Sequence, residues 1–255
     1  MKKFYGWLLR TIPRPWLIRL SYVFRLFAPL FLKGNKVECT VCKKHYRKFL
    51  PYGTHQRDNV LCPNCLTLER HRLLWLYLNE KTDFFTAKHE VLHIAPEQCF
   101  YKRFRSMSNL RYVTADLESP LADVHMDMHH MPFKNEEFDI VFANHVLEHV
   151  DDPHQCMTEV LRVLKPGGWA IMQVPIDYSR EKTYEDRSIT SPADREKHFW
   201  QKDHLRLFGR DYPERLRKAG FSVDENNFSA ALPDDVRERY RLQKEEVLYI
   251  CKKIT

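Results

Sequence analysis

The stretch that decides the fold reads FDIVFANHVLEHV and covers residues 138–150. It begins with a short apolar run, Ile140 to Ala143, that polar residues bound on both sides. Such a run is typical of a strand buried on both faces, as in the centre of a parallel sheet. Asn144 stands where the run ends, so we expect it at the carboxyl end of that strand.

The residues after this strand predict a βαβ crossover. A helix is expected to start at DDP, residues 151–153, and to stop at KPGG, residues 165–168. The run WAIMQV, residues 169–174, then predicts a second buried strand. Strand, helix, glycine turn and strand form a crossover that needs a doubly wound sheet around it. The expected fold class is therefore α/β.

FDIVFANHVLEHVDDP, followed by LRVLKPGGWAIMQVP, resembles the central and post-central motifs of the class I S-adenosylmethionine-dependent methyltransferases. More narrowly, the chain is similar to the bacterial small-molecule and glycan methyltransferases with an "LEHV" helix. The resemblance runs roughly from Glu90 to Cys251. It implies a seven-stranded doubly wound sheet, S-adenosylmethionine as cofactor, and a helix that His145 and His149 begin.

The composition favours one full domain with a small appendage. The chain has 255 residues, of which 44% are hydrophobic, and a net charge of +7. Residues 1–72 hold 15 Lys and Arg against three acids, so the basic character belongs to the N-terminal part. We expect four regions: a basic aromatic segment (1–36), a zinc ribbon (37–72), a linking helix (73–89) and a methyltransferase domain (90–255).

The segment 1–36 carries eight Lys or Arg, no acid, and many interleaved aromatic residues. Its charge-free run near the end, residues 26–32, is far shorter than the roughly 20 apolar residues of a spanning helix. Arginines interrupt the apolar residues of the segment before this run, at positions 10, 14, 19 and 25, which argues against a secretory signal. Aromatic residues mixed with Arg suit helices lying in a membrane interface. Packing on the protein's own core or a second subunit, and contact with nucleic acid, remain alternatives.

Two Cys-x-x-Cys pairs lie in residues 37–72, Cys39 with Cys42 and Cys62 with Cys65. Each pair can form a tight knuckle, and two knuckles complete a closed tetrahedral zinc site. The site leaves no open position for water, so we expect a structural zinc ion rather than a catalytic one. Zinc thiolates favour a reducing compartment, which indicates a cytoplasmic protein, with peripheral contact to the inner face of the membrane as one alternative.

The resemblance assigns the amino-acid end of the cofactor to the turn after the strand 91–95. The family has an acid and a glycine-rich turn there, whereas this chain has His93, Ala95, Glu97 and Cys99. Glycine serves such turns because backbone approaches the ligand closely or takes positive φ. We expect Glu97 to replace the missing carboxylate and to hold the cofactor's ammonium group.

The resemblance also assigns the nucleoside end of the cofactor. Asp116 ends the next strand, 112–116, where an acid accepts hydrogen bonds from two ribose hydroxyls, and Leu117 follows it. Asp127 matches the family's residue for the adenine amino group, and Met128 is expected on the adenine ring. The remaining cofactor residues expected from the family are Asn144, beside the sulfonium, and His145.

The acceptor side is expected after the second crossover strand. Residues 179–201 form a long polar insertion, which is typical of a lid or binding loop. His204 is the expected general base, because its ordinary pKa lies near 7. Asp203 and Arg206 complete the candidate catalytic group, with a packed Asp-His-Arg network as the alternative. A helix over 211–219 and an antiparallel strand pair, 221–223 with 247–251, close the domain.

These features predict methyl transfer from S-adenosylmethionine to an oxygen of a small-molecule, glycan or lipid-linked acceptor. The competing interpretation belongs to a different class. In it, the chain is a zinc-ribbon protein that binds nucleic acid or modifies RNA, with a degenerate methyltransferase domain. The oligomeric state does not follow from the sequence.

Overall fold

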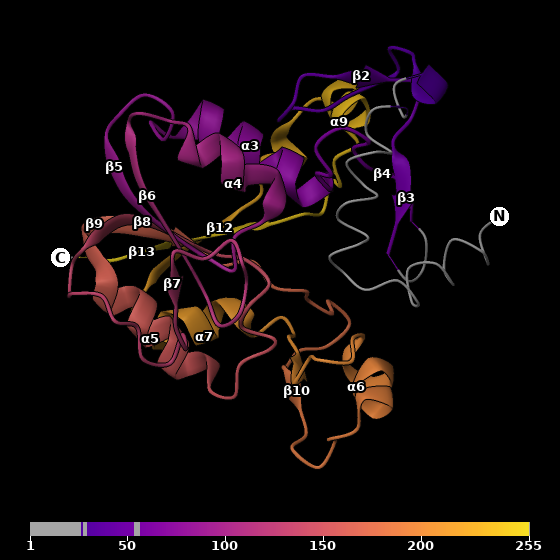
Figure 1. Ribbon diagram of the computed structural model, residues 1–255. Helices are drawn as coiled ribbons and strands as arrows, with labels where there is room; N and C mark the ends of the chain where they lie inside the picture. Colours follow the sequence, from indigo (N-terminus) through magenta and orange to yellow (C-terminus); the bar gives the residue numbers. More distant parts are fainter. Residues whose placement is uncertain (1–26, 28–29, 54–56, 255) are drawn as a thin grey trace. The chain divides into compact units, whose positions relative to one another are not determined.

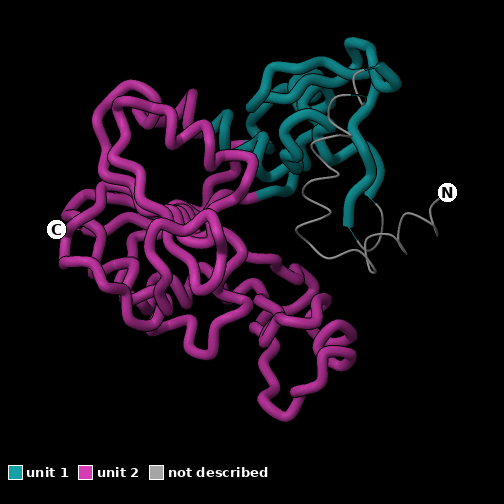
Figure 2. The backbone as a smooth tube through the Cα atoms, in the orientation of Figure 1, with its two compact units in different colours: residues 1–77, 229–246 teal, residues 78–228, 247–255 magenta. Residues whose placement is uncertain are grey.

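The computed structural model describes residues 27, 30–53 and 57–254. The chain forms two compact units, which Figure 2 draws in different colours. The ribbon unit comprises Met1–Tyr77 and Ser229–Glu246. The sheet unit comprises Leu78–Phe228 and Val247–Thr255.

The sheet unit is built on a seven-stranded sheet in the order β12-β13-β9-β8-β5-β6-β7. The five strands from β5 to β9 are parallel, and the closing pair β12 and β13 is antiparallel. The strands are β5 (His89–Ile94), β6 (Leu110–Asp116), β7 (Val124–His125), β8 (Phe138–Ala143), β9 (Leu164–Ile171), β12 (Ser222–Asn226) and β13 (Leu248–Lys252).

The chain winds outward from β5 in both directions. It first adds β6 and β7 on one side and then returns to place β8 and β9 on the other. Helix α4 (Gln98–Arg105) covers one face of the sheet, and α5 (Pro153–Val163) and α7 (Tyr212–Lys218) cover the other (Figure 1). This is the expected seven-stranded doubly wound sheet. Its strand order reverses between β5 and β8, which is where ligands bind in open α/β sheets.

Strand β8 lies at the centre, as the sequence predicts. Ile140, Val141 and Ala143 are fully buried, because neighbouring strands and helices on both faces cover them. Helix α5 starts at Pro153, with Asp152 as its N-cap accepting hydrogen bonds from the backbone of His154 and Gln155. The expectation that His145 and His149 begin this helix was wrong, since residues 144–152 form a turn-rich connection.

The polar insertion after β9 is folded. It contains β10 (Tyr184–Glu185) and α6 (Pro192–Phe199), and β10 pairs with β11 (Arg206–Leu207). Helix α7 follows, and Gly220 ends it with φ of 104°. That conformation is the left-handed one that glycine adopts at least cost.

The ribbon unit consists of two antiparallel hairpins and helical segments. Strand β1 (Val37–Glu38) pairs with β2 (His45–Tyr46), and β3 (Leu50–Tyr52) pairs with β4 (Arg57–Leu61). Helix α3 (Glu69–Lys81) begins in this unit and continues into the sheet unit. The short α8 (Phe228–Ala231) and α9 (Asp234–Tyr240) bring in the second part of its chain.

Residues 229–246 thus differ from the expected domain division, which places them with the methyltransferase domain. The fully buried guanidinium of Arg72 explains the difference. It donates hydrogen bonds to the carbonyls of Val60 and Thr67 and to those of Tyr240 and Arg241. A buried cation needs such acceptors on every side, and residues 229–246 supply two of them. Arg72 therefore binds backbone carbonyls of its own unit and is shielded from solvent.

Most of the basic aromatic segment 1–36 lies outside the described residues. Its last part belongs to the ribbon unit, because Leu32 is buried and its carbonyl accepts a hydrogen bond from the backbone of Arg47. Leu30 and Phe31, next to it, are 73% and 72% exposed. Among the helices that the structure describes, none has the length and apolar character to cross a membrane.

Candidate functional site

The candidate cofactor site lies at the carboxyl ends of β5, β6 and β8, which are neighbours in the sheet. Ala95 follows β5, Asp116 ends β6, and Asn144 follows β8. Because parallel strands end on the same edge, these residues share one rim of the sheet. The rim coincides with the point at which the strand order reverses.

Ala95 stands at the turn that leaves β5, and its φ is 50°. A non-glycine residue in the left-handed region costs free energy and persists only where its surroundings hold it. The turn therefore keeps the backbone conformation that glycine usually supplies, although no glycine is present. Glu97 follows as the N-cap residue of α4 with an extended backbone, and its side chain makes no capping hydrogen bond to the helix.

His93 and Asn144 are partners of the Glu97 carboxylate. One oxygen pairs with Nε2 of His93, and the other accepts a hydrogen bond from Nδ2 of Asn144 at 3.2 Å. Nδ1 of the buried His93 lies 2.7 Å from the hydroxyl of Tyr112. Burial, together with the nearby Glu97 carboxylate, raises the pKa of Tyr112 well above its usual range. Tyr112 therefore stays protonated and can donate to Nδ1 of His93, in the tautomer in which Nε2 donates to Glu97.

Asp116 uses one carboxylate oxygen to hold the turn after β6. Its Oδ1 accepts hydrogen bonds from the backbone N–H groups of Glu118 and Ser119, at 2.9 and 2.8 Å. Its Oδ2 has no hydrogen-bond partner among the described residues and remains available. Leu117, the next residue, is 66% exposed, which is unusual for a large apolar side chain beside a sheet edge.

Asp127 lies in the loop after β7 and is largely exposed. Its Oδ1 accepts from the backbone N–H of His129 at 2.9 Å and lies 2.6 Å from Nδ1 of the same residue. These two contacts hold the pKa of Asp127 below its ordinary value. The side chain of Met128, expected on the adenine ring, is instead buried in the core cluster of the sheet unit.

His145 follows Asn144 of the candidate cofactor site and contacts the buried carboxylate of Glu148. Its φ is 56°, so it is a second strained position, two residues after the end of the parallel strand β8. Its Nδ1 lies 3.2 Å from Oε1 of Glu148, a carboxylate that is only 1% exposed. Burial by itself raises the pKa of Glu148, but the hydrogen bond and charge of His145 outweigh it and lower the pKa.

The three expected catalytic residues do not form one network. Arg206 donates its N–H groups to the backbone carbonyls of Leu147, Val150 and Asp151, and its Nε lies 3.4 Å from Glu185. This gives Arg206 a structural role, because its donors are taken by the connection before α5. An anion-binding role for Arg206 finds no support in this geometry.

Asp203 and His204 do not contact each other's side chains but have different partners. The Asp203 carboxylate is exposed and lies 3.2 Å from Nδ1 of His149, not from His204 or Arg206. His204 is 1% exposed, and its Nδ1 lies 2.8 Å from the Phe199 carbonyl oxygen. Burial lowers the pKa of His204, so its imidazole is neutral at pH 7. Of the three residues, His204 alone keeps the properties of a base.

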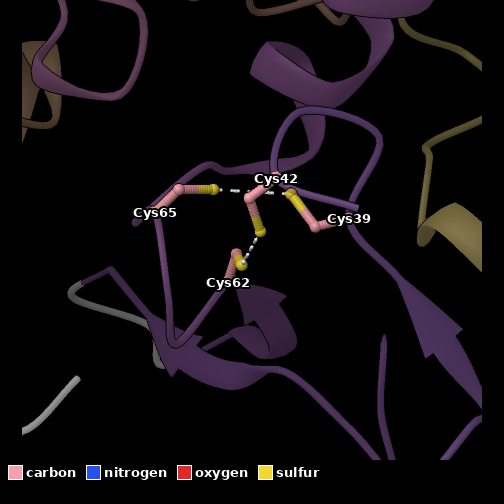
Figure 3. Close-up of side chains that lie close together, drawn as sticks. All are labelled: Cys39, Cys42, Cys62 and Cys65. Carbon is pink, nitrogen blue, oxygen red and sulfur yellow. Dashed lines mark hydrogen bonds between the residues drawn. The ribbon is translucent and has the colours of Figure 1, made fainter. Parts of the chain in front are cut away.

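The four cysteines of the ribbon unit converge on one point (Figure 3). Sγ of Cys39 lies 3.4 Å from Sγ of Cys65, and Sγ of Cys42 lies 3.7 Å from Sγ of Cys62. Both distances exceed the S–S bond of about 2.05 Å in a disulfide. A tetrahedral zinc centre with Zn–S bonds of about 2.3 Å would place its sulfurs about 3.8 Å apart. The spacing therefore fits four thiolates around one zinc ion.

The two knuckles have the same backbone geometry. Lys43 and Leu66, which follow the second cysteine of each pair, have φ of 54° and 61°. Their N–H groups donate to the carbonyls of Cys39 and Cys62, at 2.8 and 3.0 Å. The Thr67 hydroxyl lies within 3.3 Å of the sulfurs of both Cys39 and Cys65. A hydroxyl so placed orients ligand sulfurs, and no spacing rule in the sequence would have found it.

Residues 90–172 match the family model of the methyltransferase domain. This range starts in β5 and ends directly after β9, so it contains the whole cofactor rim described above. The sheet order and this match together identify the sheet unit as a Rossmann-like methyltransferase fold.

Several relatives share part of this sequence. An uncharacterized protein of Methanocaldococcus jannaschii is 35% identical over 92 residues, which cover 36% of this chain and 42% of that protein. An uncharacterized methyltransferase of Mycobacterium tuberculosis is 41% identical over 46 residues, 18% of either chain. An uncharacterized protein in transposon TN4556 of Streptomyces fradiae is 32% identical over 106 residues, covering 41% of this chain and 30% of its own. The chain spans less than half the length of each of these relatives.

Two solved structures are similar at low identity. The 1,6-didemethyltoxoflavin-N1-methyltransferase of Burkholderia thailandensis, with bound S-adenosylhomocysteine, is 15% identical with a TM-score of 0.48, covering 73% of this chain and 78% of its own. The [4+2]-cyclase SpnF is 14% identical with a TM-score of 0.49, covering 92% and 95%.

Proposed function

We propose that this protein transfers the methyl group of S-adenosylmethionine to an oxygen of an acceptor bound at the rim of β5, β6 and β8. The observation that carries the proposal is the pair of acidic side chains at that rim, Glu97 and Asp116, with Asp127 in the loop after the neighbouring strand β7. All three lie within the range that matches the methyltransferase domain. The rim also lies at the reversal of strand order, where this class of sheet binds ligands.

The residues present fit the parts of the cofactor. Glu97 has one oxygen beside Asn144 and one beside His93, and its negative charge suits the positive charge of an ammonium group. Asp116 has a free Oδ2 for the ribose hydroxyls, while Oδ1 fixes the turn. Asp127 is exposed for the adenine amino group. Ala95, at the rim itself, has the positive φ that glycine usually supplies in such a turn, so the backbone can lie close to a bound cofactor there.

The donor, when bound, supplies a methyl group on a sulfonium, which is already a good leaving group. The protein therefore contributes mainly by positioning. The bond from acceptor oxygen to methyl carbon forms as the bond from sulfur to carbon breaks, and the acceptor's hydroxyl proton must leave. Neutral His204 is the group that the sequence predicts for this proton. Its Nε2 has no hydrogen-bond partner in the described part of the chain.

The ribbon is proposed to bind one zinc ion that stabilises its fold. All four ligand positions are thiolates, so the ion has no open position for a substrate. Residues 30–53 with 57–77 and 229–246 form too small a unit for a large apolar core. The metal therefore contributes folding free energy directly.

The acceptor class is proposed from the N-terminal segment. Eight cations and several aromatic residues precede the ribbon, and the exposed Leu30 and Phe31 continue the apolar character into the described region. Such a segment suits contact with an anionic membrane surface. A glycan or lipid-linked acceptor at that surface would fit, and a small-molecule acceptor is the simpler alternative.

Calorimetric titration of the full chain with S-adenosylhomocysteine tests the proposal. We expect saturable binding with one ligand per chain, and weaker binding after Asp116 is changed. A chain that binds no S-adenosylhomocysteine but retains a nucleic acid at moderate salt would overturn methyl transfer. That result would favour the zinc-ribbon nucleic-acid-binding interpretation.

A further inference from the structure

Three side chains outside the proposed cofactor contacts lie close together, the buried Glu148 and His204 and the partly exposed His149. Glu148 and His149 come from the connection before α5, and His204 comes from the segment between α6 and β11. One ligand atom from each lies within 4.8 Å of the others. Two imidazoles and one carboxylate at this spacing are a common metal-ligand set.

The tautomer of His204 is fixed by a backbone carbonyl. Its Nδ1 lies 2.8 Å from the oxygen of Phe199, and because a carbonyl only accepts, Nδ1 carries the hydrogen. The lone pair of the neutral ring therefore sits on Nε2. That atom is buried and has no hydrogen-bond partner among the residues that the structure describes. Metal-binding histidines are oriented in this way, with the far nitrogen donating to a carbonyl or carboxylate.

His149 is held in the same manner from the same segment. Its Nδ1 lies 3.2 Å from the backbone oxygen of Asp203 and 3.2 Å from one oxygen of the Asp203 carboxylate. Both are acceptors, so Nδ1 again carries the hydrogen and Nε2 again carries the lone pair. The two rings stand nearly perpendicular, at 86°, with centroids 4.8 Å apart.

Glu148 supplies the negative charge. Its Oε1 is paired with His145, whereas its Oε2 is buried and has no hydrogen-bond partner within the described chain. Buried polar atoms are rarely left unpaired, because the loss of hydration is not recovered. Here an acceptor of Glu148 and the lone pair of His204 are both unpaired, and they belong to the same cluster. A packed core network would pair them; a bound cation would satisfy both.

We propose that Glu148, His149 and His204 bind a divalent first-row transition-metal ion. Imidazole and carboxylate ligands favour an ion such as Mn²⁺ or Fe²⁺, in contrast to the thiolates that favour zinc in the ribbon. Three protein ligands leave coordination positions open, to which oxygen atoms of an acceptor can bind. The lone pair of His204 then binds the ion. The bound ion would lower the pKa of an acceptor hydroxyl attached to it, and the hydroxyl proton would pass to water. Cation binding itself does not depend on the proposed methyl transfer.

The positive charge of the Arg206 guanidinium opposes binding of a cation at this site. It lies on the carbonyls of Leu147 and Val150, which flank Glu148 and His149. A neighbouring positive charge weakens cation binding, and Glu148 and the partly compensating Glu185 offset it. We therefore expect a site that exchanges its ion, not one as tight as the four thiolates.

The test uses the full chain. Zinc is first added to fill the four-cysteine site, and the chain is then titrated with Mn²⁺ as the only added ligand. Free Mn²⁺ is followed by electron paramagnetic resonance. We expect about one Mn²⁺ bound per chain, and affinity at least tenfold weaker in Glu148→Gln and in His204→Gln. His154→Gln removes an exposed histidine of α5, five residues after His149 in the sequence, and should bind as the parent does.

Glu148→Gln keeps the size of the buried side chain, so it separates lost coordination from lost folding. Binding of S-adenosylhomocysteine by each variant shows that the fold is intact. Absence of Mn²⁺ binding in a parent chain that binds S-adenosylhomocysteine would overturn the proposal and leave His204 as a free base. Equal Mn²⁺ affinity in parent, Glu148→Gln and His204→Gln would overturn it as well.

Discussion

Replacing Glu97 by Gln is the sharpest probe of the amino-acid end of the proposed cofactor site. The change keeps size and removes charge. The hydrogen-bond network can absorb it, since His93 can move its proton to Nδ1 and donate to Tyr112, which frees Nε2 to accept from the new amide. The amide oxygen can still accept from Asn144. The shape of the turn should therefore survive.

What the variant loses is the charge-assisted contact with the ammonium group. Hydrogen bonds to charged groups contribute about 1.5–3 kcal/mol. Calorimetry should therefore show S-adenosylhomocysteine binding weakened by about 10- to 150-fold. Adenosine has no ammonium group, so its affinity should change less than about twofold, within the scatter expected for a remote surface change.

Two outcomes would refute this reasoning. If both ligands weaken together, Glu97 holds the turn in shape and does not bind the ammonium. If neither weakens, the ammonium is bound elsewhere, for instance by backbone carbonyls around Ala95. Glu80→Gln, an exposed change on α3, is the matched control and should leave both affinities unchanged.

Three other predictions concern separate parts of the chain. Purified, reduced protein should carry about one zinc ion by metal analysis; Cys62→Ser should lower its melting temperature and its zinc content while S-adenosylhomocysteine still binds, and zinc-free wild-type protein would contradict the ribbon site. Asp116→Asn keeps the oxygen that accepts from Glu118 and Ser119 but turns Oδ2 into a donor, so calorimetry should show at least about tenfold weaker cofactor binding; unchanged affinity would mean that the ribose lies elsewhere. Deleting residues 1–29, which spares the buried Leu32, should reduce sedimentation with anionic vesicles and leave cofactor binding intact; equal sedimentation of both chains would favour packing of the segment on the protein.

The sequence predicts the central architecture well because its signals are local. The apolar run before Asn144 indicates β8, and Asp152-Pro153 indicates the start of α5, since a cap and a proline act on their own neighbours. The four cysteines meet because each knuckle needs only its own few residues. Alternation of strand and helix then leaves few possible sheet orders.

What the sequence does not reveal depends on distant parts of the chain. The LEHV residues have the apolar pattern of a helix, but residues 144–152 form turns. In these turns, backbone carbonyls accept hydrogen bonds from Arg206, which lies some 55 residues later in the sequence. The meeting of Glu148 and His149 with His204 likewise arises from the folding of the insertion after β9. Most residues of helix α9 are charged, so the sequence has no apolar pattern that would predict its packing on the ribbon. The hydrogen bond from Arg72 to the Tyr240 carbonyl therefore could not be foreseen.

The path of the chain around residues 229–246 limits how this protein can be dissected. The polypeptide passes between the two units at residues 77/78, 228/229 and 246/247, and β13 comes after the last of these passages. Because β13 lies between β12 and β9, the sheet stays incomplete until residues 248–252 are available. A fragment that begins at Leu78 would carry residues 229–246 without the Arg72 that binds their carbonyls. A fragment that ends at Tyr77 would leave that buried guanidinium with two acceptors fewer. During synthesis, residues 78–228 of the sheet unit are made before the second segment of the ribbon unit, residues 229–246, is available to Arg72.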